Sequence, residues 1–474
     1  MQENEKEEKG EEAYKTSTVN TTYIDSCPIL FAELLESDLE TDSTSRNDAA
    51  NLELYGRFFY QPQILTSHQK NSFADKHADI DTGFLKGAQI SPNGQQILLS
   101  AESGAVHSVQ VVNFNKDLLD NTTYYSNTTA SQGLNPVSKS EAMVLFSNLN
   151  VGESVYDMKW YPLIDTSASS YFITTTRDHP IHLWNANESV IKGTYAGYDH
   201  VDELDASVSV CFNLHGDKIY AGSNRMIRCF DVNRPGREYQ SIPTCKTRKS
   251  LMGQKGLIAA ISFNPDYSGA YAASSYAFNI SVYVENEKES VLSLPNLPMS
   301  STHLRWSPCG RYLWAGGRSS HEIHCFDLRQ TRTSVGTVTR NLETNQRMIF
   351  DMDPWGKFLC TGSQDGELLI YNTQTCELVH LQGSETVYNL NIQCTDLCLN
   401  TALFHPFSGL ICTVFGERYF KNYDDITSFN RNRSYQESID DSSKASYLED
   451  LDVKENSIIS RVELVRLKHD CLPW

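Results

Sequence analysis

The sequence lacks any long apolar run, and this absence already narrows the class of protein. No stretch approaches the roughly 18 consecutive apolar residues that a membrane-spanning helix needs, so we expect no membrane span. The opening residues, MQENEKEEKGEE, contain no apolar core, so we expect no secretory signal peptide. The chain contains 12 cysteines, and without a secretory signal we expect them to be buried, reduced thiols.

The motifs of common enzyme classes are also missing. There is no phosphate loop of the form GxxxxGK followed by Ser or Thr, no dinucleotide fingerprint GxGxxG and no nucleophile elbow GxSxG. The pair Cys394 and Cys398 lies in an apolar, strand-like stretch without a second pair, which favours core packing over zinc. The pairs His179–His182 and His321–His324 are three residues apart, and on a strand such residues point to opposite faces. We therefore expect a non-enzymatic protein without metal or cofactor.

Positive charge is scarce and unevenly placed. The formal net charge is −19, which excludes a basic coat for nucleic acid over the whole surface. Residues 1–55 hold 14 acidic and four basic side chains, whereas residues 225–255 hold eight basic and two acidic ones and residues 303–347 hold seven arginines and three acids. These two basic stretches either form a local basic face or merely keep loops solvated.

The two ends of the chain have the composition of tails. Residues 1–55 are acidic and poor in large apolar side chains, so we expect them to be disordered. Residues 28–31 (PILF) are an exception that fits either a docking motif or a transient helix. Residues 421–474 are polar, and we expect them to be mostly disordered. Their one apolar stripe, Ile458, Ile459, Val462 and Val465, has near-helical spacing and predicts a docking helix or a frayed one.

Between these tails, residues 84–420 repeat one pattern seven times. Each unit has an apolar strand, a turn with Pro, His or Gly, a second apolar strand and a third strand that ends in an aromatic residue. The turns centre on positions 92, 162, 215, 265, 308, 354 and 406. The third strands are 181–185 (IHLWN), 227–231 (IRCFD), 280–283 (ISVY), 323–327 (IHCFD) and 369–372 (LIYN). A period of roughly 40–50 residues with this content is typical of WD-type propeller blades. The sequence predicts an all-β fold, a seven-bladed WD-repeat β-propeller.

Two segments depart from the repeated pattern. The seventh unit lacks an outer strand after residue 420, and we expect residues 56–83, with donor strand 58–65, to supply it from the N-terminal side. The first two turns are 70 residues apart, which predicts a surface insertion at 114–150, rich in Asn, Ser and Thr.

The aromatic and acidic residues at the strand ends and hairpins are interpreted as structural. We expect the aromatic side chains to pack between blades and the hairpin aspartates to tie strands by hydrogen bonds. These positions are Asp178, Trp184, Phe230, Asp231, Phe326, Asp327, Asp365 and Tyr371.

The loops between blades carry the remaining chemistry. Residues 194–204, 234–237 and 341–347 combine Tyr, His, Arg, Asn and Gln. Such side chains stack on bases, pair with phosphates and read base edges, but they serve equally well to bind a peptide.

Several of these segments resemble one known family. They are residues 83–87 (GFLKG), 178–186 (DHPIHLWNA), 198–204 (YDHVDEL), 233–237 (NRPGR), 325–330 (CFDLRQ), 344–347 (TNQR) and 350–354 (FDMDP). In this order they resemble the telomerase Cajal body protein family, WD-repeat proteins that escort small Cajal body RNAs. The resemblance covers about residues 84–420.

The resemblance implies a non-enzymatic RNA-binding scaffold of the nucleus and its Cajal bodies. Its implied partners are box H/ACA small Cajal body RNAs, recognised at a short loop box, telomerase RNA, ribonucleoprotein proteins and other Cajal body components. An adaptor for nuclear ribonucleoprotein assembly or splicing, with little direct RNA specificity, is the alternative. Loop chemistry within the matching motifs suggests as RNA-binding residues Arg177, His179, Tyr198, His200, Arg225, Arg234, Arg237, Arg329, Asn345, Gln346 and Arg347.

Overall fold

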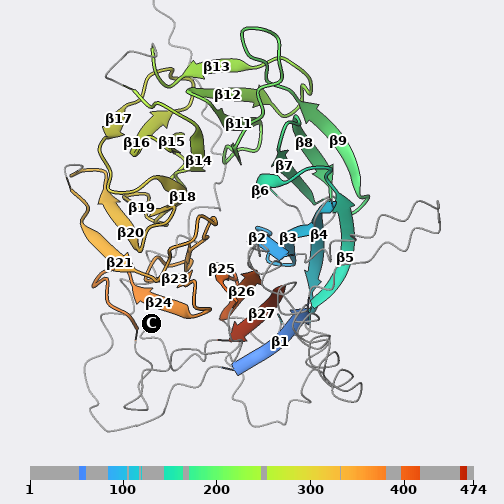
Figure 1. The fold of residues 1–474 in the computed structure, drawn as a ribbon, viewed down its shortest axis with the longest axis vertical. Coiled ribbons are helices and arrows are strands. Elements are labelled where there is room, and N and C mark those ends of the chain that lie inside the picture. The colour runs from blue at the N-terminus through green and yellow to red at the C-terminus, as the bar shows by residue number, and fades with distance from the viewer. Residues whose placement is uncertain are drawn as a thin grey trace, which may run out of the picture. The chain divides into compact units, whose positions relative to one another are not determined.

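Seven antiparallel sheets form the core of the described part of the chain. The computed structural model describes residues 53–59, 84–103, 106–116, 119, 143–163, 170–246, 253–330, 333–379, 397–416 and 460–466. All of the named elements in these residues are strands, and they form six sheets of four strands and one of three. Figure 1 shows the sheets following one another around a central axis. The prediction of an all-β, seven-bladed propeller is confirmed.

The first six sheets are consecutive in sequence. Sheet 1 contains β2 (Phe84–Ile90), β3 (Gln96–Ser103), β4 (Val106–Phe114) and β5 (Met143–Asn150). Sheet 2 contains β6 (Val155–Trp160), β7 (Tyr171–Thr176), β8 (Ile181–Asn185) and β9 (Val190–Tyr195). Sheet 3 contains β10 (Ser209–Phe212), β11 (Lys218–Ser223), β12 (Met226–Asp231) and β13 (Gln240–Pro243).

The next three sheets continue the same pattern. Sheet 4 contains β14 (Ile258–Phe263), β15 (Ala270–Ser275), β16 (Asn279–Val284) and β17 (Leu292–Leu294). Sheet 5 contains β18 (Ser301–Trp306), β19 (Tyr312–Gly317), β20 (Glu322–Asp327) and β21 (Gly336–Thr339). Sheet 6 contains β22 (Asp351–Met352), β23 (Phe358–Gly362) and β24 (Leu368–Asn372).

Sheet 7 is assembled from three distant parts of the chain. Its strands are β25 (Leu399–Phe404), β26 (Leu410–Gly416), β27 (Ser460–Arg466) and, outermost, β1 (Glu53–Phe59). In register, Val462 of β27 lies opposite Val414 of β26 and Phe58 of β1. Strands β27 and β1 are visible beside each other at the lower end of Figure 1. The structure thus closes the ring with strands from both sides of the propeller sequence.

A hydrogen bond at every junction between neighbouring sheets joins two innermost strands or, in the case of Phe350, an innermost strand and the residue just before β22. The donor and acceptor pairs are Trp160 Nε1 to Gln89 O, Val210 N to Asp157 Oδ2, Ser209 Oγ to Ile258 O, Trp306 Nε1 to Ser262 O, His303 Nε2 to Phe350 O, Phe404 N to Asp351 Oδ2 and Asn400 Nδ2 to Leu85 O. The last pair joins sheet 7 to sheet 1. Each of these donors and acceptors thereby has a hydrogen-bond partner in the neighbouring sheet.

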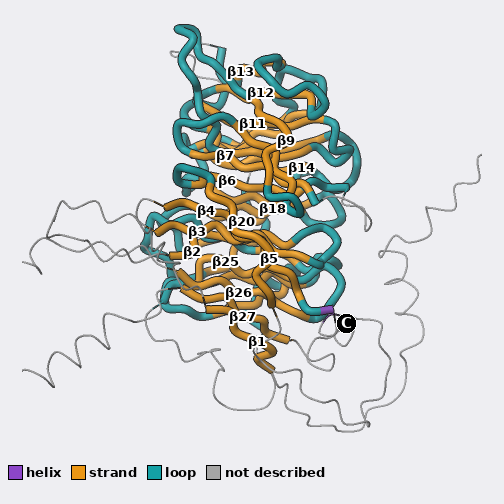
Figure 2. Tube along the Cα trace, turned by 90° about the vertical axis from the view of Figure 1, so that its right-hand side faces the viewer, coloured by secondary structure: helices purple, strands orange, loops and turns teal. Residues whose placement is uncertain are grey.

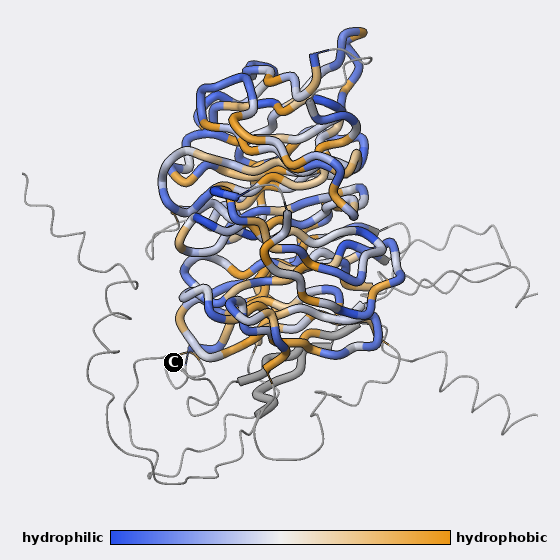
Figure 3. The backbone as a smooth tube through the Cα atoms, turned by 90° about the vertical axis from the view of Figure 1, so that its left-hand side faces the viewer, coloured by the Kyte–Doolittle hydropathy of each residue, from blue (hydrophilic) through white to orange (hydrophobic). Residues whose placement is uncertain are grey.

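A separate apolar core fills each of these junctions. For example, Val414 and Val462 of sheet 7 pack with Leu85, Ile97 and Val112 of sheet 1. Successive side chains of a strand enter the cores on opposite sides of the sheet. The hydropathy colours of Figure 3 show that apolar residues concentrate in the strands and hydrophilic ones in the connections. Because every sheet is covered on both faces by its neighbours, the sheets are stable only as a set.

The predicted turns recur at one end of the sheets. Gly94, Gly216, Gly269, Gly310 and Gly356 all have positive φ, as the repeat predicts. At Gly94 an added Cβ would lie 2.7 Å from the ring of His405, whose Nε2 donates to the Gly94 carbonyl at 2.7 Å. A larger residue at this position would therefore separate sheet 1 from sheet 7.

Two expectations about the segments outside the repeats need correction. Residues 460–466 form a strand inside sheet 7, so the helical interpretation of the stripe around Val462 and Val465 is wrong for these residues. The alternation in SRVELVR places Val462 in the core (0% exposed), and a partner strand on each side decides in favour of β structure. The expected insertion at 114–150 is shorter than proposed, because Met143–Asn150 is the outer strand β5 of sheet 1.

One further expectation about domain boundaries needs correction, and the others stay predictions. The outer strand of sheet 7 is Glu53–Phe59, so the expectation of disorder is wrong for residues 53–55, which lie in the strand that pairs with β27. The expected closing segment contributes residues 56–59 to this strand. Residues 60–83, the PILF motif at 28–31, most of the acidic tail, residues 121–129 of the insertion, Cys394 and most of the C-terminal tail lie outside the described residues.

The fold predicts that truncating Val462 will weaken the whole propeller, although this residue lies more than 40 residues beyond the end of β26. We expect Val462→Ala to lower the free energy of unfolding by about 2 kcal/mol, because a cavity opens in the core between sheets 7 and 1. Chemical denaturation followed by tryptophan fluorescence measures the loss. Val144→Ala, at a side chain 58% exposed on β5, is the control and should change stability by less than about 0.5 kcal/mol. Equal effects of the two variants would contradict a structural role for β27.

Candidate nucleic-acid interface

The connections between strands emerge on two opposite faces of the ring. In an antiparallel sheet successive connections lie at opposite ends. We call one of them the upper face. It carries the described residues of the links between sheets (151–154, 196–208, 244–246 with 253–257, 295–300 and 340–350) and the hairpins between second and third strands (177–180, 224–225, 276–278, 318–321 and 363–367). The lower face carries the Pro and Gly turns. Figure 2 shows the strands in the middle and loops on both sides.

The structure separates the predicted RNA-binding residues into two groups. The links and hairpins of the upper face bear Arg177, His179, Tyr198, His200, Arg225, Asn345, Gln346 and Arg347. In contrast, Arg234 and Arg329 follow the lower ends of β12 and β20. There, Arg329 donates to Asp327 at 2.7 and 3.0 Å, and these bonds lower the pKa of Asp327 to about 2. Arg234 lies 3.7 Å from Asp231. A single ligand on the upper face cannot use these two arginines.

Arg237 belongs with the upper group, although it lies in the same loop as Arg234. Residues 233–239 rise along the outer edge of sheet 2, where Gly236 makes a parallel bridge to Tyr195. This path brings the guanidinium of Arg237 to 4.1 Å from the centre of the Tyr198 ring. Sequence spacing gives no sign of this stack, because three strands, β10 to β12, separate the two residues.

A buried arginine beneath this stack holds the loop that carries Tyr198. Arg228 of β12 is 3% exposed. Its guanidinium donates to Asp205 Oδ2 at 2.6 Å, to the Tyr198 carbonyl at 3.1 Å and to Ser223 Oγ at 2.8 Å. It also lies over the Tyr239 ring at 5.4 Å. The arginine thus joins Tyr198 and Asp205, near the two ends of the link 196–208, to sheet 3.

The close packing of Arg228 also restricts which residue can stand at position 197, next to Tyr198. A Cβ at Gly197 would lie 2.7 Å from the Arg228 side chain, so only glycine fits here without a shift. The hydroxyl of Tyr239 donates to the Tyr198 carbonyl at 3.1 Å. Tyr198 therefore has a fixed backbone, and its ring is half-buried below Arg237.

The tip of the same link presents His200 to solvent. The Asp199 carboxylate accepts the backbone N–H groups of Glu203 and Val201, each at 2.9 Å, and these bonds lower the pKa of Asp199. The turn leaves the His200 side chain 91% exposed. Asp202 and Glu203 are also exposed, so the tip is acidic apart from the histidine.

The second predicted loop, 341–347, faces a different part of the ring. Arg347 reaches across to sheet 2, where it pairs with Asp157 at 3.2 Å and donates to the Tyr156 carbonyl at 3.1 Å. Asn345 accepts from Arg318 Nε at 3.1 Å and from Ser319 Oγ at 2.8 Å. Arg347 is thus engaged in a contact within the ring, while Asn345 and Arg318 remain exposed.

The strand-end aromatic residues lie in the cores between sheets. Trp184 packs with residues of sheet 1, Phe230 with sheet 2, Phe326 with sheet 4 and Tyr371 with sheet 5. Trp184 Nε1 also donates to Thr174 Oγ1 at 2.9 Å.

The hairpin aspartates differ from one another. Asp365 accepts from Asn341 Nδ2 at 2.6 Å. Asp178 is 80% exposed, and its carboxylate pairs with the neighbouring Arg177 at 3.3 Å. The carboxylates that do link neighbouring sheets, Asp157 and Asp351, are on the innermost strands.

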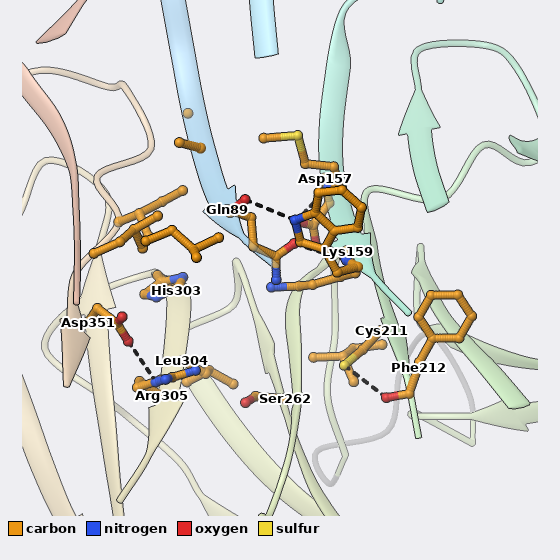
Figure 4. A pocket seen from close by; sticks show the side chains of 18 of the residues that line it. Gln89, Asp157, Lys159, Cys211, Phe212, Ser262, His303, Leu304, Arg305 and Asp351 are labelled. Carbon is orange, nitrogen blue, oxygen red and sulfur yellow. Dashed lines mark hydrogen bonds and ion pairs between the residues drawn. The ribbon is translucent and has the colours of Figure 1, made fainter. Parts of the chain in front are cut away.

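A cavity of about 420 Å³ lies at the centre of the ring. It is lined by the innermost strands, and Figure 4 shows Lys159, His303, Arg305 and Asp351 around it. Sequence reasoning missed these residues. The spacing of two between Asp157 and Lys159 and between His303 and Arg305 was the available indication, because polar residues two apart on an inner strand share one side.

Among the residues that the structure describes, no group of three or more His, Cys, Asp and Glu side chains lies close enough to hold a metal ion. No helix within the described ranges is long and apolar enough to cross a membrane.

The network around Arg228 predicts a specific loss of order when this residue is truncated. We expect Arg228→Met to lower the free energy of unfolding by about 3 kcal/mol, because Asp205 loses its partner in a largely buried site. We also expect faster amide hydrogen exchange in residues 197–205, measured by mass spectrometry. Arg225→Met, on the hairpin three residues away, is the matched control. Unchanged exchange in 197–205 would show that other contacts hold the link.

The fold and the loop arrangement together define the class of protein: a closed seven-bladed WD-type propeller with a charged and aromatic upper face. No family model matches the chain. Comparison with curated proteins is more informative. The chain is 31% identical to telomerase Cajal body protein 1 of Bos taurus and 30% identical to that of Homo sapiens, in each case over 71% of this chain and 58% of the relative. It is also 26% identical to the guanine nucleotide-binding protein negative regulator 1 of Schizosaccharomyces pombe, over 57% of this chain and 67% of the relative.

These similarities identify the family that the sequence motifs suggest. The chain belongs to the telomerase Cajal body protein family. It spans somewhat under three fifths of the length of the curated family members that it matches.

Proposed function

We propose that the chain is a non-enzymatic RNA-binding scaffold whose upper face recognises a short loop box in box H/ACA small Cajal body RNAs. The observation that supports this most directly is the stack of Arg237 on Tyr198, 4.1 Å apart. An aromatic ring and a guanidinium that already lie together offer a stacking surface for an unpaired base and a charge for its phosphate. Hairpin loops of RNA present such bases.

Three further features of the described residues agree with this proposal. The link that carries Tyr198 is held by a buried arginine, so little conformational entropy is lost when a base stacks there. Arg225 and Arg177 lie on neighbouring hairpins of the same face. The chain also belongs to a family whose members are named for telomerase and Cajal bodies. We extend the proposal to the nucleus and the Cajal body as its location, and to telomerase RNA and ribonucleoprotein proteins as further partners.

The proposal predicts different effects for two arginines of one loop. We expect Tyr198→Ala and Arg237→Ala each to weaken binding of an H/ACA hairpin RNA about tenfold, because a stacked base contributes about 1–3 kcal/mol. Fluorescence anisotropy with a labelled hairpin, at several salt concentrations, measures the affinity and its salt dependence. Arg234→Ala is the matched control, since Arg234 is equally charged and exposed but lies on the lower face. Equal losses for Arg234→Ala and Arg237→Ala would overturn the assignment to the upper face.

A test in cells addresses the identity of the RNA. Crosslinking of the full chain to RNA in its own cells, followed by sequencing, should enrich hairpin-loop sites of H/ACA small RNAs over a mock capture. The same capture with Tyr198→Ala should lose that enrichment. A spectrum equal to the mock capture would reject the RNA-binding proposal.

One observation favours the adaptor alternative. Val144 and Phe146 on β5, and Val190 and Ile191 on β9, are between 42% and 58% exposed on the outer strands of adjacent sheets. Ser147 Oγ lies 3.5 Å from the Ala186 carbonyl, which holds these two edges together. Exposed apolar side chains on neighbouring outer strands are a surface on which a protein partner gains binding energy. Phe146→Asp should release such a partner in a quantitative pull-down and leave RNA affinity unchanged.

A further inference from the structure

The cavity at the centre of the ring contains more positive than negative charge. Its lining includes Lys159 of β6, Arg305 of β18 and Arg347, together with the carboxylates of Asp157 and Asp351. These residues come from sheets 2, 5 and 6 and from the link before sheet 6, so they approach the cavity from different sides. Figure 4 shows several of them directed toward one space.

Both carboxylates are already satisfied by the protein. Asp157 Oδ2 accepts the Val210 N–H at 3.1 Å, and Oδ1 lies 3.2 Å from Arg347. Asp351 Oδ2 accepts the Phe404 N–H at 3.1 Å, and Oδ1 lies 2.9 Å from Arg305 Nε. Each carboxylate thus pairs with one arginine, so the two negative charges balance two of the three positive charges and leave one in excess.

Several hydrogen-bond donors that line this cavity have no acceptor among the described residues. Lys159 has no hydrogen-bond or ion-pair partner within the described part of the chain. Arg305 contacts Asp351 through Nε, so its two Nη atoms remain available. The buried Nε of Arg347 has no acceptor among the described residues. His303 does not contribute charge, because burial lowers its pKa well below the usual value, and its Nε2 donates to the Phe350 carbonyl.

We propose that the central cavity binds a phosphate monoester, with the phosphate group at Lys159, Arg305 and Arg347. Donors from three directions suit a tetrahedral dianion better than a planar carboxylate, and lysine and arginine are the side chains that bind phosphate groups in proteins. A cavity of about 420 Å³ accommodates a ligand the size of a mononucleotide. This site is separate from the proposed stacking site on the upper face and does not depend on it.

The phosphate group reaches the cavity from one of two sources. One is a free phosphorylated metabolite. The other is the terminal phosphate of an RNA that lies on the upper face. Both place the same chemistry at Lys159, so one variant tests both.

The test is calorimetric titration of the full chain with adenosine 5′-monophosphate at constant ionic strength, with adenosine as the probe that lacks a phosphate. We expect binding of the monophosphate and none of adenosine. We expect Lys159→Gln to weaken the monophosphate at least tenfold, since a charge-assisted hydrogen bond is lost, and Lys159→Arg to retain most of the affinity. Lys192→Gln, on β9 of the same sheet and outside the cavity, is the matched control.

Three outcomes would overturn the site: equal affinity of the wild type and Lys159→Gln, equal affinity for adenosine and its monophosphate, or no binding of the monophosphate. Unfolding midpoints of all variants establish that each is folded, which is expected because the Lys159 side chain makes no hydrogen bond or ion pair with the described residues. A parallel measurement with hairpin RNA identifies the source once the site is supported. A loss of RNA affinity in Lys159→Gln assigns the phosphate to RNA, and an unchanged affinity assigns it to a free metabolite.

Discussion

The burial of each sheet between its two neighbours is the constraint on which the rest of the structure depends. A four-stranded sheet with two apolar faces has no stable surface of its own, so it needs a covering sheet on each side. Six of the sheets meet this need with consecutive segments of the chain. The junction between sheets 7 and 1 also requires β1 and β27, whose Val462 completes the core around Leu85 and Ile97. Removing a neighbour would expose the apolar face that it covers and open the ring, so the arrangement of the loops depends on this closure.

A rigid ring gives the loops fixed positions, and buried charge fixes one of them more tightly. Arg228 is almost fully buried, and burying an unpaired guanidinium would be unfavourable. Its partners on the link 198–205 therefore hold that link in one conformation. The consequence is a tyrosine ring and an arginine in contact before any ligand arrives. Preorganised aromatic and cationic groups of this kind favour binding because less freedom is lost on association.

The same ring creates a second environment along its axis. Inner strands present their edges toward the centre, where side chains from opposite sheets meet only after closure. The contact of Arg347 with Asp157 joins residues that are 190 positions apart, and His303 is surrounded by Arg347, Lys159 and Arg305. The upper face and the central cavity thus meet at Arg347, which lies in a link of the upper face and also lines the cavity. The two places nevertheless offer different chemistry. The first offers stacking, and the second offers a surplus of hydrogen-bond donors.

The sequence by itself determined the seven repeats, the turns at Gly94 and Gly310 and the aromatic strand ends, because these depend on local backbone geometry and on alternation within a strand. It also indicated the links that carry Tyr198 and Asn345, since they interrupt the repeat. The tertiary structure alone decided which strands close sheet 7, and it made residues 460–466 a strand because two partner strands outweighed a helical pattern of apolar residues. It likewise decided that Arg237 joins Tyr198 while Arg234 faces the opposite side, and that Lys159 meets Arg305. Such contacts join residues far apart in sequence, and only closure of the ring sets the distances between them.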